Sequence, residues 1–319
     1  MSCNKEHKTS IGGQAVIEGV MMRGPKLIAT SVRKTDGEIV TDIKPVKATN
    51  KKIAKLPIIR GCVNFFASMV TGVKCLMFSA EFFDIEEENA KPSKIDAWLE
   101  KTFGDKLKDY VIYFSVILSI LLSVGLFILL PTFVAGLLHI TSGFAKTFVE
   151  GVIRIGLFVL YIALVAQMED IKRVFMYHGA EHKSIFCYEK GLPLTVENVR
   201  KCKRFHPRCG TSFIFIVLIT SVIVSFIVSF LFPELKESEY RIIWTIVKMV
   251  AILPVVTGIS YELIKYAGRH DNIITKIFSA PGLWMQRITT KEPTDDMIEV
   301  AIASIKAVIT DNPEDDRLE

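Results

Sequence analysis

The segment that decides the fold is YVIYFSVILSILLSVGLFILLPTFVAGLL, Tyr110–Leu138. It lies in a stretch between Asp109 and Lys146 that contains no Asp, Glu, Lys or Arg. A transmembrane helix needs about 20 apolar residues, so this segment is long enough to cross a bilayer. The sequence therefore predicts a membrane protein.

Further apolar segments lie outward from this one. They cover approximately residues 148–167, 209–233 and 242–261, and each contains few or no charged side chains. Sustained hydropathy over such lengths is typical of membrane helices. We therefore predict about four transmembrane helices, two on each side of the connection 168–208.

Positive charge in the loops predicts how these helices are oriented. The connection 168–208 is rich in Lys and Arg, whereas 139–147 and 233–241 carry few. Loops with excess Lys and Arg stay in the cytoplasm. We therefore expect the long loop and both termini on the cytoplasmic side of a cell membrane. The bilayer and its anionic lipids explain the net charge of +5, so no nucleic-acid partner is expected.

The composition agrees with a chain divided between lipid and water. Of 319 residues, 50% are hydrophobic and 23% are charged, and the mean hydropathy is +0.37. These values exclude a disordered chain and exceed those of an ordinary soluble enzyme. Six cysteines are too few for a disulfide scaffold, which favours reduced thiols. The polar start MSCNKEHKTS predicts no signal peptide.

The segment RGCVNFFASMVTGVKCLMFSAEFF, residues 60–83, is harder to assign. It is apolar but is interrupted by Lys74 and by small residues. We expect residues 60–108 to form an interfacial or re-entrant helical segment. A fifth crossing is the alternative, and it would invert the orientation of the residues before it.

The remaining segments predict a small cytoplasmic α+β portion, so the fold class is membrane α-helical with an N-terminal β-hairpin. The hairpin is centred on Asp36-Gly37, between alternating apolar and polar residues, where a tight turn needs positive φ. An amphipathic helix should begin after Thr294, and the final residues read as a solvated acidic tail. The predicted divisions are 1–59, 60–108, 109–167 (helices 1 and 2), 168–208 (cytoplasmic loop), 209–261 (helices 3 and 4) and 262–319.

The long loop contains YHGAEHK, Tyr177–Lys183. On a helix, His178 and His182 project from one face, so both imidazoles can reach one metal ion. The order H-x-x-E-H is that of inverzincin metallopeptidases, in which the carboxylate is the general base. We therefore predict a divalent metal, zinc by analogy, with Glu181 as base. The competing interpretation is a pair of interfacial histidines beside a solvated glutamate.

A catalytic zinc ion usually has a third protein ligand and an open position for water. The candidates are His206, Cys209 and Glu262. Glu262 is included because the fourth helix returns to the cytoplasmic surface there, although a charge that merely flanks a membrane helix is an equal alternative.

Two other arrangements of these side chains compete with the catalytic site. A closed structural metal site would combine Cys187, Cys202, His206 and Cys209, although the spacing lacks paired C-x-x-C motifs. A catalytic pair of Cys209 and His206 would need a lowered thiol pKa, for which the sequence gives no sign.

At these residues the chain resembles the DUF1385 family of bacterial multi-pass membrane proteins, which are described as predicted metal-dependent enzymes. The matching stretches are GGQAVIEGVMMRGP (12–25), YHGAEHK (177–183), HPRCGTSF (206–213), GISYELIK (258–265) and TTKEP (289–293). The resemblance implies no substrate. It draws attention to the polar residues in its motifs, which are Glu18, Arg23, His178, Glu181, His182, His206, Arg208, Cys209 and Glu262.

Two functions remain open from the sequence. The first is a metal-dependent hydrolase acting at the cytoplasmic membrane face on a peptide or a membrane-embedded or lipid-linked substrate, in which Arg208 or Arg23 stabilises developing negative charge. The second is a non-enzymatic membrane scaffold or transport-associated protein with a structural or regulatory metal. Neither hypothesis fixes an oligomeric state.

Overall fold

The computed structural model describes residues 8–46, 56–83, 107–140, 143–231, 241–270, 272–310 and 312–317. Residues 84–106 of the predicted interfacial segment therefore lie outside the described residues. The chain forms two compact units. The first comprises Met1–Phe83, Tyr161–Ser221 and Ala251–Glu319, and the second comprises Asp84–Leu160 and Val222–Val250.

The first unit begins with a four-stranded antiparallel sheet in the order β1-β2-β3-β4. Its strands are β1 (Gly12–Val16), β2 (Gly19–Arg23), β3 (Leu27–Arg33) and β4 (Ile39–Pro45). The predicted hairpin around Asp36-Gly37 is confirmed as β3 and β4, and Gly37 has a φ of 88°. The turn is longer than the tight one predicted. The hydrogen bond that closes it runs from the Lys34 N–H to the Glu38 carbonyl at 2.9 Å.

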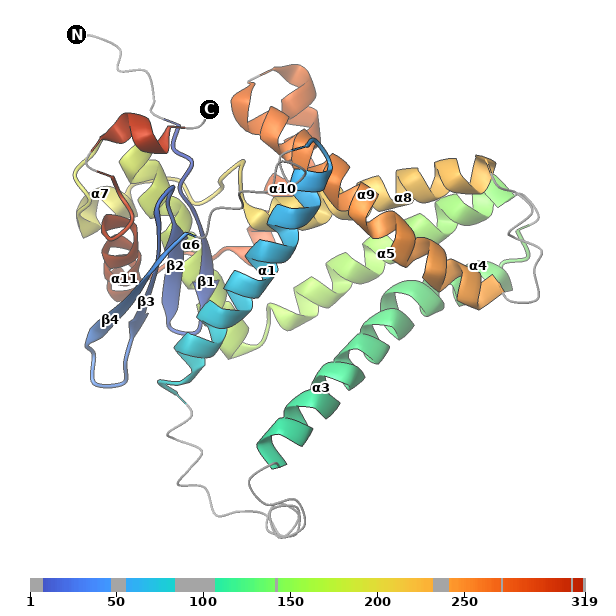
Figure 1. Ribbon diagram of the computed structural model, residues 1–319, viewed down its shortest axis with the longest axis horizontal. Helices are drawn as coiled ribbons and strands as arrows, with labels where there is room; N and C mark the ends of the chain where they lie inside the picture. Colours follow the sequence, from blue (N-terminus) through green and yellow to red (C-terminus); the bar gives the residue numbers. More distant parts are fainter. Residues whose placement is uncertain are drawn as a thin grey trace. The chain divides into compact units, whose positions relative to one another are not determined.

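Helices cover both faces of this sheet (Figure 1). One face packs against α6 (Glu169–Glu189) and α11 (Asp295–Lys306), with α7 (Val196–Arg200) beside them. Side chains alternate along β2, so Val20 and Met22 enter the core with α6 and α11, whereas Met21 packs toward α1. The amphipathic helix predicted after Thr294 is confirmed as α11.

The opposite face of the sheet carries α1 (Ile59–Ala80). Small side chains line its contact with the sheet, and the Ser79 Oγ accepts the Ile17 N–H at 3.3 Å. The other side of α1 exposes large apolar side chains, among them Val73 and Met77. The helix therefore has one face on the sheet and one unpartnered apolar face among the described residues.

Long helices complete the chain. They are α3 (Leu107–Val124), the π-helical η4 (Gly125–Leu129), α4 (Leu130–Leu137), α5 (Gly143–Val165), α8 (Gly210–Leu231), α9 (Arg241–Arg269) and α10 (Ile273–Thr289). In the second unit, α5 buries Arg154, whose Nε donates to the Phe127 carbonyl of η4 at 2.9 Å. A backbone carbonyl thus partners a charged side chain inside an apolar segment.

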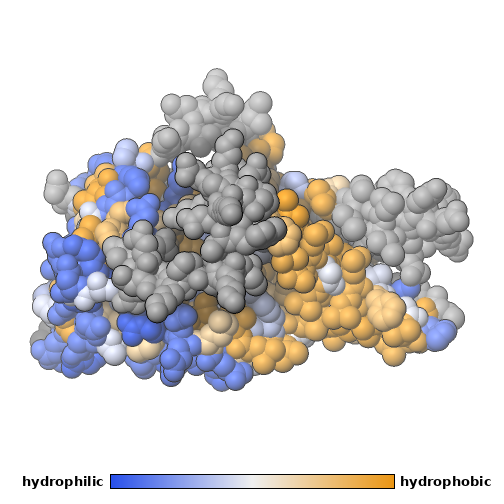
Figure 2. Space-filling model, turned by 90° about the horizontal axis from the view of Figure 1, so that it is seen from below, coloured by the Kyte–Doolittle hydropathy of each residue, from blue (hydrophilic) through white to orange (hydrophobic). Residues whose placement is uncertain are grey.

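Five helices in the described part of the chain are long and apolar enough to cross a membrane. They are Ile59–Ala80, Phe114–Leu137, Phe144–Val165, Gly210–Val228 and Val250–Ala267. The predicted mostly helical fold is confirmed, the predicted N-terminal hairpin is part of a small antiparallel sheet, and the predicted count of four membrane helices is approximate. Figure 2 shows hydrophobic residues gathered over one part of the visible face and hydrophilic residues over another.

The predicted solvated tail is wrong at one residue. Asp316, in the 3-10 helix Pro313–Asp316, is fully buried and accepts a hydrogen bond from the Tyr188 hydroxyl at 2.5 Å. The Thr9 hydroxyl donates to the Asp316 carbonyl, which ties the N-terminal segment to the C-terminal one. Pairing with a tyrosine of α6 offsets the cost of burying this carboxylate, and composition alone does not reveal such a partner.

Candidate metal centre

Three side chains with metal-ligating atoms meet where α6 approaches the start of α8. His178 and His182 lie one turn apart on α6, with ring centroids 4.4 Å apart. Cys209 lies immediately before α8, which begins at Gly210. One ligand atom from each of these residues lies within 4.8 Å of the others, and all three side chains are buried. The predicted i, i+4 placement of the histidines is therefore realised, and Cys209 is the third candidate that joins them.

Backbone carbonyls orient both imidazole rings. The Nδ1 of His178 lies 2.8 Å from the Thr289 carbonyl, and the Nδ1 of His182 lies 2.5 Å from the Arg204 carbonyl. A carbonyl oxygen only accepts, so each Nδ1 carries a proton and each Nε2 is the ring nitrogen left for a ligand. Metal-ligating histidines in proteins are oriented in this way. Burial lowers the pKa of His178, but Cys209 outweighs burial and raises it to about 9, so a metal ion at this Nε2 would displace a proton.

The electrostatics favour a thiolate at Cys209. Burial raises the pKa of this thiol, but the neighbouring His178 and His182 outweigh burial and hold the pKa well below its ordinary value. The Nε2 of His178 lies 3.1 Å from the Cys209 Sγ. The thiolate is the form of cysteine that binds metals.

Glu181 lies beside these three residues. Its side chain is buried, and burial raises its pKa, while His178 and His182 act in the opposite direction. The Gly13 N–H of β1 donates to the carboxylate. The Oε2 atom has no hydrogen-bond partner among the described residues, so one carboxylate oxygen is available for a proton or a ligand.

His206 and Arg208 belong to a neighbouring cluster around Glu189. The Arg208 guanidinium forms an ion pair with Glu189, whose other oxygen lies 3.6 Å from the His206 Nε2. Burial raises the pKa of Glu189, but His206 and Arg208 lower it below its ordinary value. The structure therefore places His206 next to His182, with ring centroids 5.6 Å apart, but not in the ligand group.

The peptide groups of His206 are held by Gln286 of α10. The Gln286 Oε1 accepts the His206 N–H at 2.7 Å, and the Gln286 Nε2 donates to the His206 carbonyl at 2.7 Å. These two bonds fix the segment that leads to Cys209. They give His206 and Gln286 a positioning role in this arrangement.

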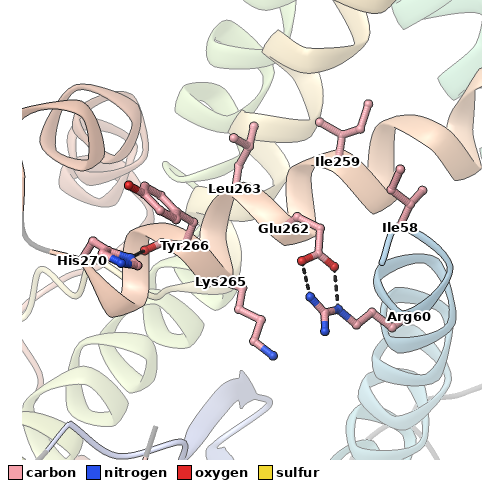
Figure 3. A pocket seen from close by; sticks show the side chains of 8 residues that line it. All are labelled: Ile58, Arg60, Ile259, Glu262, Leu263, Lys265, Tyr266 and His270. Atoms are coloured by element: carbon pink, nitrogen blue, oxygen red, sulfur yellow. Dashed lines mark hydrogen bonds and ion pairs between the residues drawn. The ribbon is translucent and has the colours of Figure 1, made fainter. Parts of the chain in front are cut away.

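The structure does not bring Glu262 to the histidines. Its carboxylate is held by the Arg60 guanidinium through both oxygens, beside a separate pocket of about 490 Å³ (Figure 3). Close packing of α1 on α9 creates this pair, because Gly61 lies directly against Gly258 and Tyr261. The position of Glu262 at the end of the fourth predicted membrane helix gave no information about this partner.

Cys187 and Cys202 also lie apart from Cys209. The Cys187 thiol faces the Pro193 carbonyl, and burial together with Cys202 raises its pKa to about 11. The Cys202 thiol bonds the Asn198 carbonyl at 3.4 Å. Among the described residues, the four-ligand structural site considered from the sequence is therefore not assembled.

Sequence reasoning missed the residues that support the site. Gly13, Thr289, Arg204 and Gln286 act through a backbone group or an amide, and none has a ligand-like side chain. The motifs GGQAVIEGVMMRGP and TTKEP contain Gly13 and Thr289, so the resemblance was the only signal for them. Arg204 and Gln286 lie outside those motifs.

Comparisons with known proteins agree with this resemblance. The model of the family described as "Protein of unknown function (DUF1385)" matches residues 56–311. The chain is 37% identical over 315 residues to the uncharacterized protein YqhQ of Bacillus subtilis (strain 168), covering 95% of this chain and 94% of that protein. No solved structure matches the chain. The chain therefore belongs to the DUF1385 family.

Proposed function

We propose that this protein is an integral-membrane, zinc-dependent hydrolase. The convergence of the His178, His182 and Cys209 ligand atoms within 4.8 Å carries the proposal. Two imidazoles and a thiolate suit zinc, and three protein ligands leave a position for water or substrate. When bound, zinc would supply a Lewis acid and activate a water molecule for attack.

The chain's own residues provide the proton chemistry. Glu181 is the general base, since its unpartnered Oε2 can accept a proton from the attacking water and return it to the leaving group. A buried carboxylate with a raised pKa is suited to both steps. Arg208 does not stabilise negative charge in this proposal, because its guanidinium is paired with Glu189.

The packing of the sheet supports one membrane topology. The sheet and α6 share a core, so β4 and α6 must lie on the same side of a bilayer. Three candidate spans, α1, α3 with α4, and α5, separate them along the chain. An even number of crossings is required, so we propose that α1 lies on the membrane surface and that four helices cross. The Lys- and Arg-rich loop supports a site at the cytoplasmic face in this topology.

Metal analysis of the purified full-length protein tests the proposal. We expect about one zinc ion per chain, lost in the His178→Ala, His182→Ala double variant. The Glu181→Gln variant should keep its zinc, because the base is not a ligand. A protein that purifies without zinc, or any other divalent metal, would disprove the proposed chemistry.

A scaffold with a structural metal is the second candidate. The burial of His178, Glu181, His182 and Cys209 favours it, because closed structural sites use four protein ligands and Glu181 could be the fourth. The Glu181→Gln variant separates the two functions. Loss of zinc in this variant favours the scaffold, whereas retained zinc with loss of the cellular function favours the hydrolase.

A further inference from the structure

A pocket of about 430 Å³ lies between the sheet and α1. We call it the Arg23 pocket. Side chains and backbone of β1 and β2 line one wall, and α1 lines the other. The lining residues that matter here are Gly12, Gly13, Gln14, Arg23, Ser68 and Thr71.

Arg23 is the only charged residue among the described residues that line this pocket. Its guanidinium forms no hydrogen bond or ion pair with another described residue, unlike Arg60, Arg173, Arg200 and Arg208, which all hold carboxylates. A guanidinium binds a phosphate through two parallel hydrogen bonds. The hydroxyl of Ser68 adds a further donor of the kind that phosphate oxygens accept, whereas the Thr71 hydroxyl already donates to the Ala67 carbonyl at 2.8 Å.

Gly13 joins this pocket to the candidate metal centre. It lines the pocket, and its N–H donates to the Glu181 carboxylate on the other side of the strand. A Cβ atom added to Gly13 would lie 2.9 Å from the Glu181 Cδ. The backbone of a single glycine therefore separates the pocket from the proposed base.

The exposed apolar side of α1 indicates where an anionic ligand would come from. Phe66, Met69 and Val70 surround Ser68 in sequence and are 48%, 51% and 56% exposed. This apolar face suits the acyl boundary of a bilayer, and the polar face lines the pocket at headgroup level. A lipid phosphate in that leaflet can therefore reach Arg23.

We propose that the Arg23 pocket binds the phosphate headgroup of an anionic lipid. The inference goes beyond the proposed function, because it adds a lipid-binding site next to the candidate metal centre. The phosphate is recognised by Arg23 and the Ser68 hydroxyl, and the absence of a side chain at Gly12 leaves room for it, since a Cβ there would meet nothing within 4 Å.

Calorimetric titration of the full-length protein in detergent tests this assignment. The probes are dihexanoyl phosphatidic acid, which is soluble as a monomer, and inorganic phosphate. We expect the lipid to bind, and Arg23→Gln to weaken binding by at least about tenfold, which is the effect of losing a charge-assisted contact. Lys34→Gln removes one charge from the exposed β3–β4 turn and should leave the affinity unchanged.

The outcomes separate the sources of the phosphate. Tighter binding of the short-chain lipid than of inorganic phosphate, dependent on Arg23, supports the proposal. Equal binding of both probes overturns the lipid as the source. Binding that is the same in wild type and Arg23→Gln overturns the pocket itself, because phosphate would then be held elsewhere.

Zinc measured on the same samples distinguishes this inference from the proposed function. Zinc without Arg23-dependent lipid binding overturns the pocket and leaves the hydrolase standing. Arg23-dependent lipid binding by a protein that contains no zinc overturns the hydrolase and leaves the pocket standing. The Glu181→Gln variant should bind the lipid as wild type does, because Arg23, and not the carboxylate, holds the phosphate.

Discussion

At the scale of single residues, the site depends on groups that are held by the backbone. Each histidine of α6 has one nitrogen bonded to a carbonyl, from Thr289 or from Arg204. Glu181 is held in turn by the Gly13 N–H. Side-chain identity alone therefore does not make the site, because neighbouring backbone groups fix which ring nitrogen and which carboxylate oxygen remain available.

Gly13→Ala tests the close approach of β1 and Glu181. The new Cβ would lie 2.6 Å from the Met21 carbonyl, a backbone atom, and 2.9 Å from the Glu181 Cδ. We expect a loss of stability of roughly 1–3 kcal/mol, measured by thermal unfolding in detergent, with zinc retained. Gly12→Ala is the matched control, since its Cβ meets nothing within 4 Å. Equal unfolding temperatures for the two variants would contradict the packing described here.

At the scale of elements, the position of α6 against the segment after α10 sets the geometry of His178. The Lys291 N–H bonds the Phe175 carbonyl of α6 at 2.8 Å. Gly179 lets the two backbones approach, since a Cβ there would lie 2.0 Å from the Lys291 carbonyl. The same segment supplies the Thr289 carbonyl that orients the His178 ring, so the packing of α6 on this segment also sets the orientation of His178.

Gly179→Ala should therefore disturb both stability and metal content. The clash with the Lys291 carbonyl cannot be relieved by a side-chain rotation, so α6 must shift away from residues 289–291. We expect destabilisation of roughly 1–3 kcal/mol or more and a reduced zinc content per folded chain. Gly156→Ala in α5, where a Cβ meets nothing within 4 Å, should change neither quantity. Unchanged zinc in a clearly destabilised Gly179→Ala protein would show that His178 keeps its orientation without this contact.

At the scale of the whole chain, the shared core of the sheet, α6 and α11 constrains the membrane topology. Residues from the N-terminal strands, the central loop and the C-terminal segment all enter this core, including Val20, Tyr177 and Ile298. In the topology that we propose, the helices between these segments therefore cross the bilayer in pairs and α1 lies on its surface.

Reporter fusions test this arrangement. We expect green fluorescent protein fused to either end of the chain to fluoresce in bacterial cells, because it matures in the cytoplasm. Alkaline phosphatase, which needs the oxidising periplasm, should be inactive at both ends. A crossing by α1 would move the N-terminus outward, so an active N-terminal phosphatase fusion would refute the proposed topology.

The sequence by itself determined the features that depend on local pattern. Uninterrupted hydropathy predicted the long apolar helices, Asp36-Gly37 predicted the hairpin, and the spacing of His178 and His182 placed both rings on one helical face. These predictions succeeded because hydropathy, turn chemistry and helical periodicity act between residues that are close in the chain.

Only the tertiary structure decided which distant residues meet. Cys209, Glu262 and His206 were equivalent candidates in the sequence, yet Cys209 joins the histidines, Arg60 holds Glu262 and the Glu189 cluster takes up His206. The burial of Glu181 against Gly13 likewise arises from strand and helix packing across long sequence separations. Such contacts depend on which faces of the helices and strands are buried together. A local sequence pattern predicts that a face is buried, but it does not predict which other element covers that face.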